Sequence, residues 1–510
     1  MSGKKPKPAA SDGVRGKRRA PAHVPAGGSR AFHGYDDALA FLESRVNVEA
    51  LSPTQVDGAA TFRLDRMRAL MDRLENPQSS FKCVHVAGSK GKGSVCEMLA
   101  SCLQACGIAT GLYTSPHLVD MSERIRICRD PIGRGAFSTL LARAADAADA
   151  IARAHGDATY FELLTATAFL HFAEQAVDVA VIEVGLGGRD DATNIITPEA
   201  CGITAIHVEH ARLLGPAIED IARHKAGIIK PGIPAVSVPQ SAPVAGVLRA
   251  RAAEVGTTLE FLGEDIDYSF RFESSPELGP HTRVVVTTPR SSFEHLPVPL
   301  KGEHQAVNCA LALALIDKLR TRGVEAPEAA VAQGLSATPS LGRLETVRMR
   351  PRVVVDGAHT PESVQALIKA LGAQVRYDSL VVVFGCASDK DAGGMLAALA
   401  TGADKVIFTR AHGNARAADP RDLQRRFSEV SGKMSQLAPN VREALALAAR
   451  AVNRDDLVLV TGSFAVAGEA KRHAQASAPS PGVPDGALRE VKLSGVARGR
   501  DARGKPGERL

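Results

Sequence analysis

Short apolar runs alternate with helical stretches through the middle of the chain. The runs at residues 81–88 (FKCVHVAG), 177–185 (VDVAVIEVG) and 201–208 (CGITAIHV) have the composition of buried strands, and each ends where polar residues begin. This alternation predicts an α/β fold with a parallel sheet. Ligands collect beyond the carboxyl ends of such strands, so we expect functional residues there.

A second cycle of the same kind begins later in the chain. Its strands are predicted within residues 352–360, 379–391, 404–410 and 456–463. Between the two cycles, residues 336–345 (SATPSLGRLE) contain the Pro and Gly that suit a linker. We therefore predict two domains, at residues 31–338 and 339–470, flanked by tails at residues 1–30 and 471–510.

Both predicted tails are basic. Residues 1–30 hold eight Lys and Arg against one Asp, and residues 471–510 hold nine against four Asp and Glu. The whole chain carries a formal net charge of +6, so the stretch between the tails is net acidic. Both tails are rich in Pro, Gly, Ser and Ala and are expected to be disordered. Basic tails can bind nucleic acid, but Trp is absent and no patch with interleaved aromatic residues supports that interpretation.

The composition favours a cytoplasmic protein. The 510 residues are 45% hydrophobic, which is enough for two sizeable cores. The sequence has no run of about 18 apolar residues, and its basic N-terminus lacks the apolar segment of a signal peptide. None of the eight cysteines forms a CxxC pair. Cys102 and Cys106 lie one helical turn apart in a predicted buried face, so we expect reduced core cysteines rather than a metal site.

Residues 85–94 read HVAGSKGKGS and join a predicted strand to a predicted helix. Backbone N–H groups in a glycine-rich turn and at a helix N-terminus favour an anion, and Lys92 adds a positive charge. The stretch departs from the pattern G-x-x-x-x-G-K-[ST], because only two residues separate Gly88 from Gly91 and Gly93 separates Lys92 from Ser94. A nucleotide phosphate is the expected ligand, and a glycine-rich turn without a ligand is the alternative.

Two further polar residues lie at predicted strand ends. Glu183 ends an apolar strand, where a carboxylate is costly to bury unless it is paired or bound to a metal. Mg²⁺ beside the phosphates is one explanation, because Mg²⁺ takes oxygen ligands from carboxylates and from the nucleotide. A salt bridge to Arg189 is the other. His210 lies just beyond another strand end and is a candidate ligand or a polar residue without a catalytic role.

Ten motifs, in order over residues 36–470, resemble those of the bacterial folylpolyglutamate synthase/dihydrofolate synthase family of Mur-type ligases. They are HVAGSKGKGS (85–94), TSPHLVDMSERIRI (114–127), TYFELLTATAFL (159–170), VIEVGLGGRDDATNII (181–196), HKAGIIKPG (224–232), GEHQAVNCALAL (302–313), LGRLE (341–345), DGAHTPE (356–362), FGCASDKD (384–391) and VTGSFAVAGE (460–469). The resemblance implies a Mur-ligase-like P-loop nucleotide-binding domain with a parallel-rich sheet, followed by a smaller Rossmann-like C-terminal domain. It also implies an ATP-dependent ligase that adds L-glutamate to dihydropteroate or folate through an acyl phosphate.

The resemblance assigns roles residue by residue. It implies an ATP site formed by Gly88, Ser89, Lys90, Gly91, Lys92, Gly93, Ser94, Asn308, Arg343 and Asp356. It implies two Mg²⁺ held by Ser115, Glu183, His210 and a carbamylated Lys225, with Lys225, His210 and Lys92 as catalytic residues. It implies a pterin pocket lined by Thr159, Tyr160, Asp190, Asp191 and Ala192. His359 and Lys390 are further candidates, and a surface role is the alternative for Lys390. We expect a monomer that uses small-molecule substrates and has neither a membrane nor a nucleic-acid partner.

Four positions depart from the family pattern. Lys90 and Thr360 each stand where Asn is usual, and Glu209 stands where Asp is usual. Asp190 replaces an apolar residue beside the predicted pterin pocket. None of the four removes a predicted metal ligand, so they affect the expected substrate preference more than the expected ATP chemistry.

Two other functions remain open from the sequence. A Mur-type ligase acting on a cell-wall precursor would share the glycine loop, Glu183, His210 and Lys225, but the motifs at residues 114–127 and 159–170 resemble the folate branch. A nucleotide-binding protein without ligase activity, which contacts nucleic acid through its tails, is the second alternative.

Overall fold

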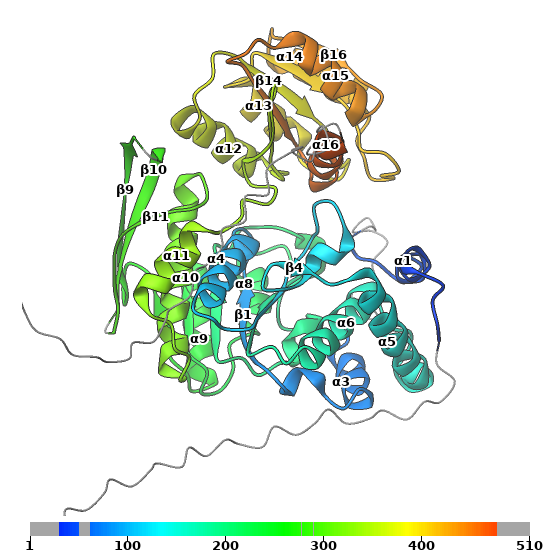
Figure 1. Cartoon of the computed structure of the whole chain (residues 1–510), viewed down its shortest axis with the longest axis vertical. Helices are drawn as coiled ribbons and strands as arrows, with labels where there is room; N and C mark the ends of the chain where they lie inside the picture. The colour runs from blue at the N-terminus through cyan, green and yellow to red at the C-terminus, as the bar shows by residue number, and fades with distance from the viewer. Residues whose placement is uncertain (1–29, 50–61, 277, 289, 477–510) are drawn as a thin grey trace, which may run out of the picture.

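The computed structural model describes residues 30–49, 62–276, 278–288 and 290–476. The predicted tails therefore lie outside the described residues, apart from residue 30 and residues 471–476. Figure 1 shows a larger N-terminal α/β domain below a smaller C-terminal α/β domain, with a separate small sheet at the side of the larger one. This arrangement confirms the predicted α/β class with a parallel-rich sheet.

The N-terminal domain is built on an eight-stranded sheet with the order β4-β3-β2-β5-β1-β6-β7-β8. Its strands are β1 (Lys82–Ala87), β2 (Thr110–Tyr113), β3 (Ile125–Ile127), β4 (Asp130–Pro131), β5 (Val179–Glu183), β6 (Ala200–Ile203), β7 (Ala235–Ser237) and β8 (Leu259–Phe261). In this order the six neighbouring strands β2-β5-β1-β6-β7-β8 pair in parallel. Strands β3 and β4 add an antiparallel edge beside β2. The three strands predicted first, β1, β5 and β6, lie side by side at the centre.

Helices cover both faces of this sheet. They are α1 (Tyr35–Glu43), α3 (Leu64–Arg73), α4 (Lys92–Ala105), α5 (Arg134–His155), α6 (Tyr160–Glu174), α7 (Ala211–Leu214), α8 (Ile218–Ala226), α9 (Ala242–Glu254), α10 (Glu303–Thr321) and α11 (Glu328–Ser336), with short 3₁₀ turns at Pro77–Ser79, Met121–Arg124 and Ala192–Ile195. Alternate residues of β1 supply the two cores. Val84 and Val86 pack with α4 and α10, and Cys83 packs with α5 and α6 on the other face. Both faces are buried, which explains why the central strands are mostly apolar.

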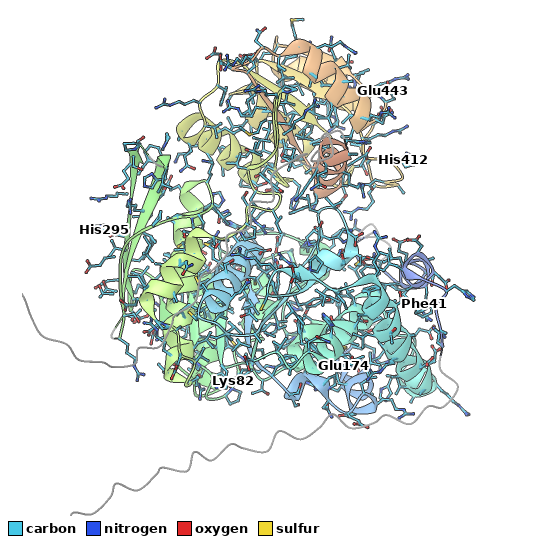
Figure 2. The ribbon with its side chains drawn as sticks, in the orientation of Figure 1. Phe41, Lys82, Glu174, His295, His412 and Glu443 are labelled. Atoms are coloured by element: carbon cyan, nitrogen blue, oxygen red, sulfur yellow. The ribbon has the colours of Figure 1, made fainter. Side chains whose placement is uncertain are left out.

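The small sheet was not predicted from the sequence. Its strands are β9 (Asp267–Ser275), β10 (Gly279–Thr287) and β11 (Ser292–Pro297), paired antiparallel. Val284, Val286 and Phe293 are buried in the same core as α4 and α10, whereas Phe270 and Phe272 lie on the exposed side. Figure 2 shows His295 of β11 at the outer edge of the molecule. One apolar face therefore anchors the sheet to the N-terminal domain.

The C-terminal domain has a six-stranded sheet with the order β12-β13-β17-β14-β15-β16. Its elements are β12 (Glu345–Met349), β13 (Arg352–Val355), α12 (Pro361–Gln374), β14 (Leu380–Phe384), α13 (Ala392–Ala400), β15 (Lys405–Phe408), α14 (Pro420–Val430), β16 (Met434–Leu437), α15 (Val441–Ala451), β17 (Leu457–Thr461) and α16 (Phe464–Ala476). Helices α12, α13 and α14 share one core with the sheet, and α15 and α16 share another. The four strands predicted from the second cycle are β13, β14, β15 and β17.

Helix α16 extends past the predicted domain end at residue 470. Residues 471–476 are helical, and the buried Lys471 pairs with Glu345 on β12 at 2.7 Å. Lys471, one of the basic residues that favoured the prediction of a tail, is thus part of an ion pair within the C-terminal domain.

All eight cysteines are free thiols, with Cys102 buried and Cys106 half-buried. Among the described helices, none combines the length and apolar character needed to cross a bilayer.

The domains meet through backbone as well as side chains. A Cβ atom on Gly468 of α16 would lie 1.7 Å from the carbonyl oxygen of Leu118, so the loop that carries Leu118 lies directly on that helix. The Leu118 side chain is buried in the core formed by β13 and α16. The loop after β2 therefore belongs to the N-terminal sheet by sequence and packs on the C-terminal domain.

Close contact between α4 and α11 gives a stability prediction. A Cβ atom on Gly334 of α11 would lie 2.4 Å from the carbonyl oxygen of Ser101 on α4. We expect Gly334→Ala to lower the free energy of unfolding by about 1–3 kcal/mol, because the added methyl group forces the helices apart. Gly246→Ala in α9 is the matched control, since nothing lies within 4 Å of that position. It is expected to add about 0.5–1 kcal/mol. Denaturant unfolding measures both, and a gain in stability for Gly334→Ala contradicts the packing described here.

Candidate active site

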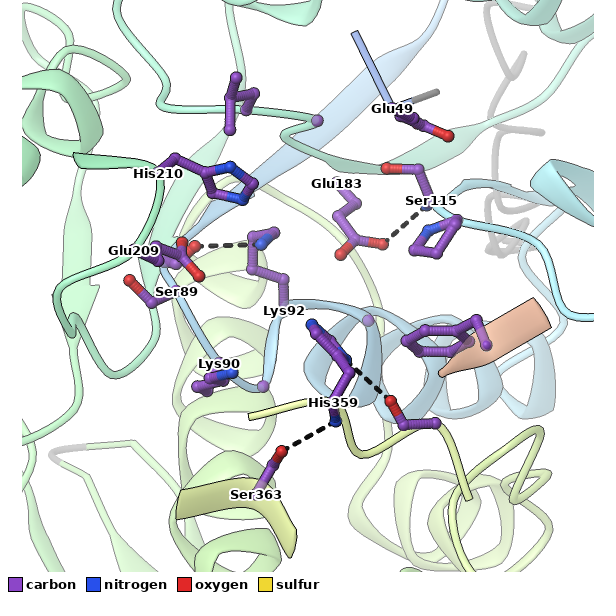
Figure 3. A pocket seen from close by; sticks show the side chains of 18 of the residues that line it. Glu49, Ser89, Lys90, Lys92, Ser115, Glu183, Glu209, His210, His359 and Ser363 are labelled. Atoms are coloured by element: carbon purple, nitrogen blue, oxygen red, sulfur yellow. Dashed lines mark hydrogen bonds between the residues drawn. The ribbon is translucent and has the colours of Figure 1, made fainter. Parts of the chain in front are cut away.

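A cavity of about 1370 Å³ lies between the two domains, beyond the carboxyl ends of β1, β5 and β6. The residues predicted from the sequence that line it are Gly88, Ser89, Lys90, Gly91, Lys92, Gly93, Ser94, Ser115, Thr159, Glu183, Asp190, Asp191, Ala192, His210, Lys225, Asn308, Arg343, Asp356, His359 and Lys390. Figure 3 shows Lys92, Glu183, Glu209 and His210 around one space. The structure thus brings together, around one cavity, residues that are up to 302 positions apart in the sequence.

The glycine loop follows β1 and leads into α4, as the sequence predicts. Gly88 and Gly91 have φ angles of +147° and +97°, in the region that favours glycine. Lys92, the first residue of α4, donates from Nζ to the carbonyl oxygen of Gly88 at 3.0 Å. The loop is therefore compact, and the N-terminus of α4 faces the cavity with a cation beside it. This is the arrangement that binds phosphate groups.

Two residues predicted to contact ATP approach this loop from other elements. A Cβ atom on Gly91 would lie 2.4 Å from Oδ1 of Asn308 on α10. A Cβ atom on Gly93 would lie 2.5 Å from Nη2 of Arg343, which precedes β12. The glycines therefore leave the space that Asn308 and Arg343 occupy, and Arg343 brings a positive charge from the interdomain segment to the loop.

Glu183 is buried at the end of β5. Its Oε2 accepts a hydrogen bond from the backbone N–H of Ser115 at 3.0 Å. Burial raises the pKa of this carboxyl, although Lys92 and Arg343 act in the opposite direction. The alternative salt bridge is not what the structure shows, because Arg189 is an exposed residue that pairs with Asp190 at 3.0 Å. A buried carboxylate beside a phosphate loop, without a direct ion pair to Arg189, fits a cation site.

His210 and Lys225 line the same cavity as Ser115. Burial lowers the pKa of His210 to about 4, so its imidazole is neutral at pH 7. Lys225 at the end of α8 is 2% exposed. Its Nζ donates to the Gly88 carbonyl oxygen at 2.8 Å and to Glu209 Oε1 at 3.0 Å. Burial lowers the pKa of Lys225 to about 8, and Lys225 in turn holds the pKa of Glu209 at about 2.

The predicted pterin pocket needs one correction. Tyr160 begins α6 and is buried in the core, where its hydroxyl group lies 3.4 Å from the Met121 sulfur atom. The next residue, Phe161, lines the cavity instead. Successive residues of a helix point about 100° apart, and here Phe161 is directed toward the cavity whereas Tyr160 is directed into the core. The motif located the helix start but did not show which residue faces inward.

The acidic residues near Phe161 have separate structural tasks. Asp191 is buried and accepts hydrogen bonds from the N–H groups of Leu186 and Thr193 at 2.8 and 3.0 Å, which shapes the loop after β5. Asp190 is half-exposed and pairs with Arg189. Thr159 caps α6 and forms a capping box with Glu162. Asp191 is thus oriented by its loop, whereas Asp190 is available to a ligand in the cavity.

Asp356 holds the interdomain segment at the end of β13. Its carboxylate accepts hydrogen bonds from the N–H groups of Leu344 and Ala358 at 2.9 and 2.8 Å. Burial raises its pKa to about 6. These bonds fix the residue after Arg343, so Asp356 orients Arg343 toward the loop. His359 follows, with its Nδ1 2.8 Å from the Gly357 carbonyl oxygen and its pKa lowered to about 4 by burial.

The sequence did not single out the buried Arg124. This residue lies in the motif at residues 114–127, pairs with both oxygens of Glu49, and donates from Nε to His117 Nδ1 at 3.0 Å. Glu49 lines the cavity, and its backbone carbonyl oxygen accepts a hydrogen bond from Arg416 of the C-terminal domain. The repeated Arg in ERIRI was the available signal, but its partner is 75 positions away.

Comparison with known proteins agrees with this geometry. Residues 86–316 match the family model described as Mur ligase middle domain, and residues 342–464 match Mur ligase, glutamate ligase domain. The chain is 35% identical to the folylpolyglutamate synthase of Lacticaseibacillus casei over 79% of this chain and 92% of that protein. It is also 35% identical to the dihydrofolate synthase/folylpolyglutamate synthase of Mycobacterium tuberculosis, over 82% and 90% of the two chains.

Two further comparisons complete this result. The crystal structure of the Mycobacterium tuberculosis folylpolyglutamate synthase complexed with ADP and AMPPCP superposes with a TM-score of 0.77 at 33% identity, covering 86% of this chain and 98% of that one. A probable bifunctional folylpolyglutamate synthase/dihydropteroate synthase of Halobacterium salinarum is 35% identical over 81% of this chain, which spans 51% of that longer protein. Both Mur ligase models match in order, and the chain covers 92% and 90% of the Lacticaseibacillus casei and Mycobacterium tuberculosis synthases, so it belongs to the folylpolyglutamate synthase/dihydrofolate synthase family of Mur ligases.

Proposed function

We propose that the protein is an ATP-dependent ligase that adds L-glutamate to dihydropteroate, to reduced folates, or to both. The observation that carries the proposal is the single cavity lined by the glycine loop, Glu183 and Lys225 from one domain and by Arg343 and Asp356 from the other. The relatives described above are named for this chemistry. Both domains that line the cavity come from one chain, so a monomer is sufficient.

The proposed reaction begins with a carboxylate of the pterin-bearing acid, which attacks the γ-phosphorus of ATP and displaces ADP. The resulting acyl phosphate is then attacked by the neutral amino group of glutamate, and phosphate leaves as the amide forms. Two anions must meet in the first step, so stabilising negative charge is the main task of the site. The N-terminus of α4, Lys92 and Arg343 supply positive potential where the phosphates would lie. The cavity between the domains also limits the access of water to the acyl phosphate.

The side chains of Ser115, Glu183 and His210 fit a Mg²⁺ site that the nucleotide completes. They offer a hydroxyl, a carboxylate and a neutral imidazole, and among the described residues no three His, Cys, Asp or Glu side chains form a full metal cage. Mg²⁺ typically takes one or two protein carboxylates and fills its remaining positions with phosphate oxygens and water. When bound, the ion would neutralise charge on the transferring phosphoryl group.

We further propose that Lys225 is carbamylated and then holds a second Mg²⁺. Its placement supports this, because Lys225 is 2% exposed at the edge of the phosphate loop and its lowered pKa leaves part of its amine neutral and able to react with CO₂. The modification replaces a cation by an anionic oxygen donor. Glu209, now paired with Lys225 at 3.0 Å, would then need Lys92 or the metal to balance its charge.

The proposed pterin pocket is formed by five residues that line the same cavity, Thr159, Phe161, Asp190, Asp191 and Ala192. Phe161 offers an aromatic surface for the ring, and the half-exposed Asp190 offers a hydrogen-bond acceptor for a ring N–H or amino group. His359 and Lys390 line the C-terminal side, from which glutamate would enter.

An ADP-release assay tests the proposed function. We expect ADP to form with ATP and Mg²⁺ only when both L-glutamate and dihydropteroate, or both L-glutamate and a reduced folate, are present. ADP release with a cell-wall precursor and not with pterin acids would show a different Mur-type ligase. Absence of release with all of these acceptors would show that the chain binds nucleotide without ligase activity.

The cation site at Glu183 gives a sharp prediction. Glu183→Gln keeps the size of the side chain and an oxygen for the Ser115 N–H but removes the charge. We expect kcat to fall at least about a hundredfold, the scale of one strong electrostatic contact. Thermal stability should change little or rise, because a buried carboxylate is neutralised.

A matched control for this variant is Glu97→Gln on α4. Glu97 is equally buried but forms an ion pair with Arg126. This change should lower stability by about 3 kcal/mol, since it leaves a buried cation unpaired, while folded protein keeps near-parent turnover. If Glu183→Gln behaves like this control, Glu183 is structural and the metal assignment is wrong.

The proposed carbamate gives another prediction. Lys225→Ala should abolish turnover but leave nucleotide binding intact, because the glycine loop does not need this side chain to form. Short carboxylic acids should restore part of the activity, and ¹³C-bicarbonate should label the parent protein with a carbamate signal in the NMR spectrum that the variant lacks. Lys230→Met is the control from the same motif, since Lys230 Nζ donates to the Asn194 carbonyl oxygen at 2.8 Å outside the cavity. Parent-like turnover of Lys225→Ala would exclude the carbamate.

A further inference from the structure

Lys90 makes a direct contact between the phosphate loop and the C-terminal domain. Its Nζ donates a hydrogen bond to Thr360 Oγ1 at 3.0 Å, across 270 positions of sequence. The backbone N–H of Lys90 donates to the carbonyl oxygen of Ala205, just beyond β6, at 3.2 Å. The loop end of the contact is therefore fixed to the N-terminal sheet. Figure 3 shows Lys90 on the side of the loop that faces His359 and Ser363.

Thr360 is equally fixed at the other end of the contact. It caps α12, and its Oγ1 accepts from the N–H of Ser363 at 3.4 Å and lies 3.1 Å from the Ser363 hydroxyl oxygen. A threonine hydroxyl has one donor and two acceptor positions. Lys90 and Ser363 therefore both bind this hydroxyl group. The hydroxyl group thus orders the first turn of α12 and binds Lys90 at once.

The charges around this contact favour an anion in the loop. Lys90 lies at the N-terminal end of α12, where the helix dipole repels a cation. Burial is the main cause that lowers the pKa of Lys90. The carboxylates of Glu209 and Glu362 act in the opposite direction, and Lys390 and Lys92 add a smaller repulsion. A nucleotide phosphate beside Lys90 and Lys92 would supply a further counter-charge to this buried cation and make the contact between the domains more favourable.

We propose that Lys90 is a positioning residue that links an occupied phosphate loop to the closed arrangement of the two domains, through its hydrogen bond to Thr360. Thr360 accepts a hydrogen bond from one of the three N–H groups of the Lys90 ammonium. The other two N–H groups are left to donate to a phosphate of the bound nucleotide. The inference rests on the proposed function where it is tested by the rate measurements below, which need ligase turnover. The scattering measurement tests it without turnover.

A double-mutant cycle on turnover is the first test. Lys90→Met and Thr360→Val should each lower kcat about tenfold, the equivalent of one charge-assisted hydrogen bond. The double variant should be no slower than the slower single variant, because either change breaks the same contact. Thr360→Ser should keep the parent rate, since it retains the hydroxyl group. Loss of a phosphate contact alone would raise KM for ATP in Lys90→Met and leave Thr360→Val unaffected, which would overturn the proposal.

The matched control is Lys369→Met on the same helix. Lys369 pairs with Glu303 of the N-terminal domain at 2.6 Å, but both side chains are exposed, at 74% and 60%. Such a pair contributes little, so this variant should keep the parent kcat. If the kcat losses of the two single variants multiply in the double variant, the two residues act independently and the inference is overturned. The inference is also overturned if the kcat losses of Thr360→Val, Thr360→Ser and Lys369→Met follow their losses of thermal stability, because the role is then merely structural.

Small-angle X-ray scattering tests the link without turnover. Addition of Mg²⁺ and AMPPCP should decrease the radius of gyration of the parent protein and of Lys369→Met, and should do so much less in Lys90→Met and Thr360→Val. This result without any ligase activity would support the link while the proposed function fails. Equal compaction in all four proteins would overturn the link and leave the function standing.

Discussion

The start of α4 leaves no room for side chains at Gly91 and Gly93, and the site depends on that constraint. Asn308 from α10 and Arg343 from the interdomain segment fill the space beside Gly91 and Gly93. A methyl group at either glycine would push away a residue that faces the phosphate site. The same turn directs the backbone N–H groups of α4 into the cavity. One local requirement for glycine therefore sets the position of three separate elements.

The charges of the cavity are arranged around this turn. Lys92 bonds back to the Gly88 carbonyl oxygen, and Lys225 reaches the same oxygen from α8. Glu209 balances Lys225, whereas Glu183 has a backbone N–H and nearby cations but lies away from Arg189. A site of this kind is closer to neutral with a nucleotide and a divalent ion than without them, because buried charges need partners.

The second domain completes the site through its connection rather than through its core. Asp356 at the end of β13 holds Leu344, and this contact places Arg343 over the loop. Lys90 makes a second connection, from the phosphate loop to Thr360 at the N-terminus of α12. The loop residue Leu118 provides a third contact between the domains, because its backbone carbonyl lies directly on Gly468 of α16.

The sequence by itself determined the parts of this protein that local patterns encode. Apolar runs located β1, β5, β6 and four strands of the second domain, and ten ordered motifs indicated the family. These features are visible because strand burial, glycine turns and strand-end residues each leave a mark within a few positions. Only the tertiary structure decided that Phe161 rather than Tyr160 faces the cavity, that Arg124 pairs with Glu49, and that residues 267–297 form a separate sheet. Those outcomes depend on helix rotation, on contacts between distant residues and on which face finds an apolar surface, and no short stretch of sequence contains that information.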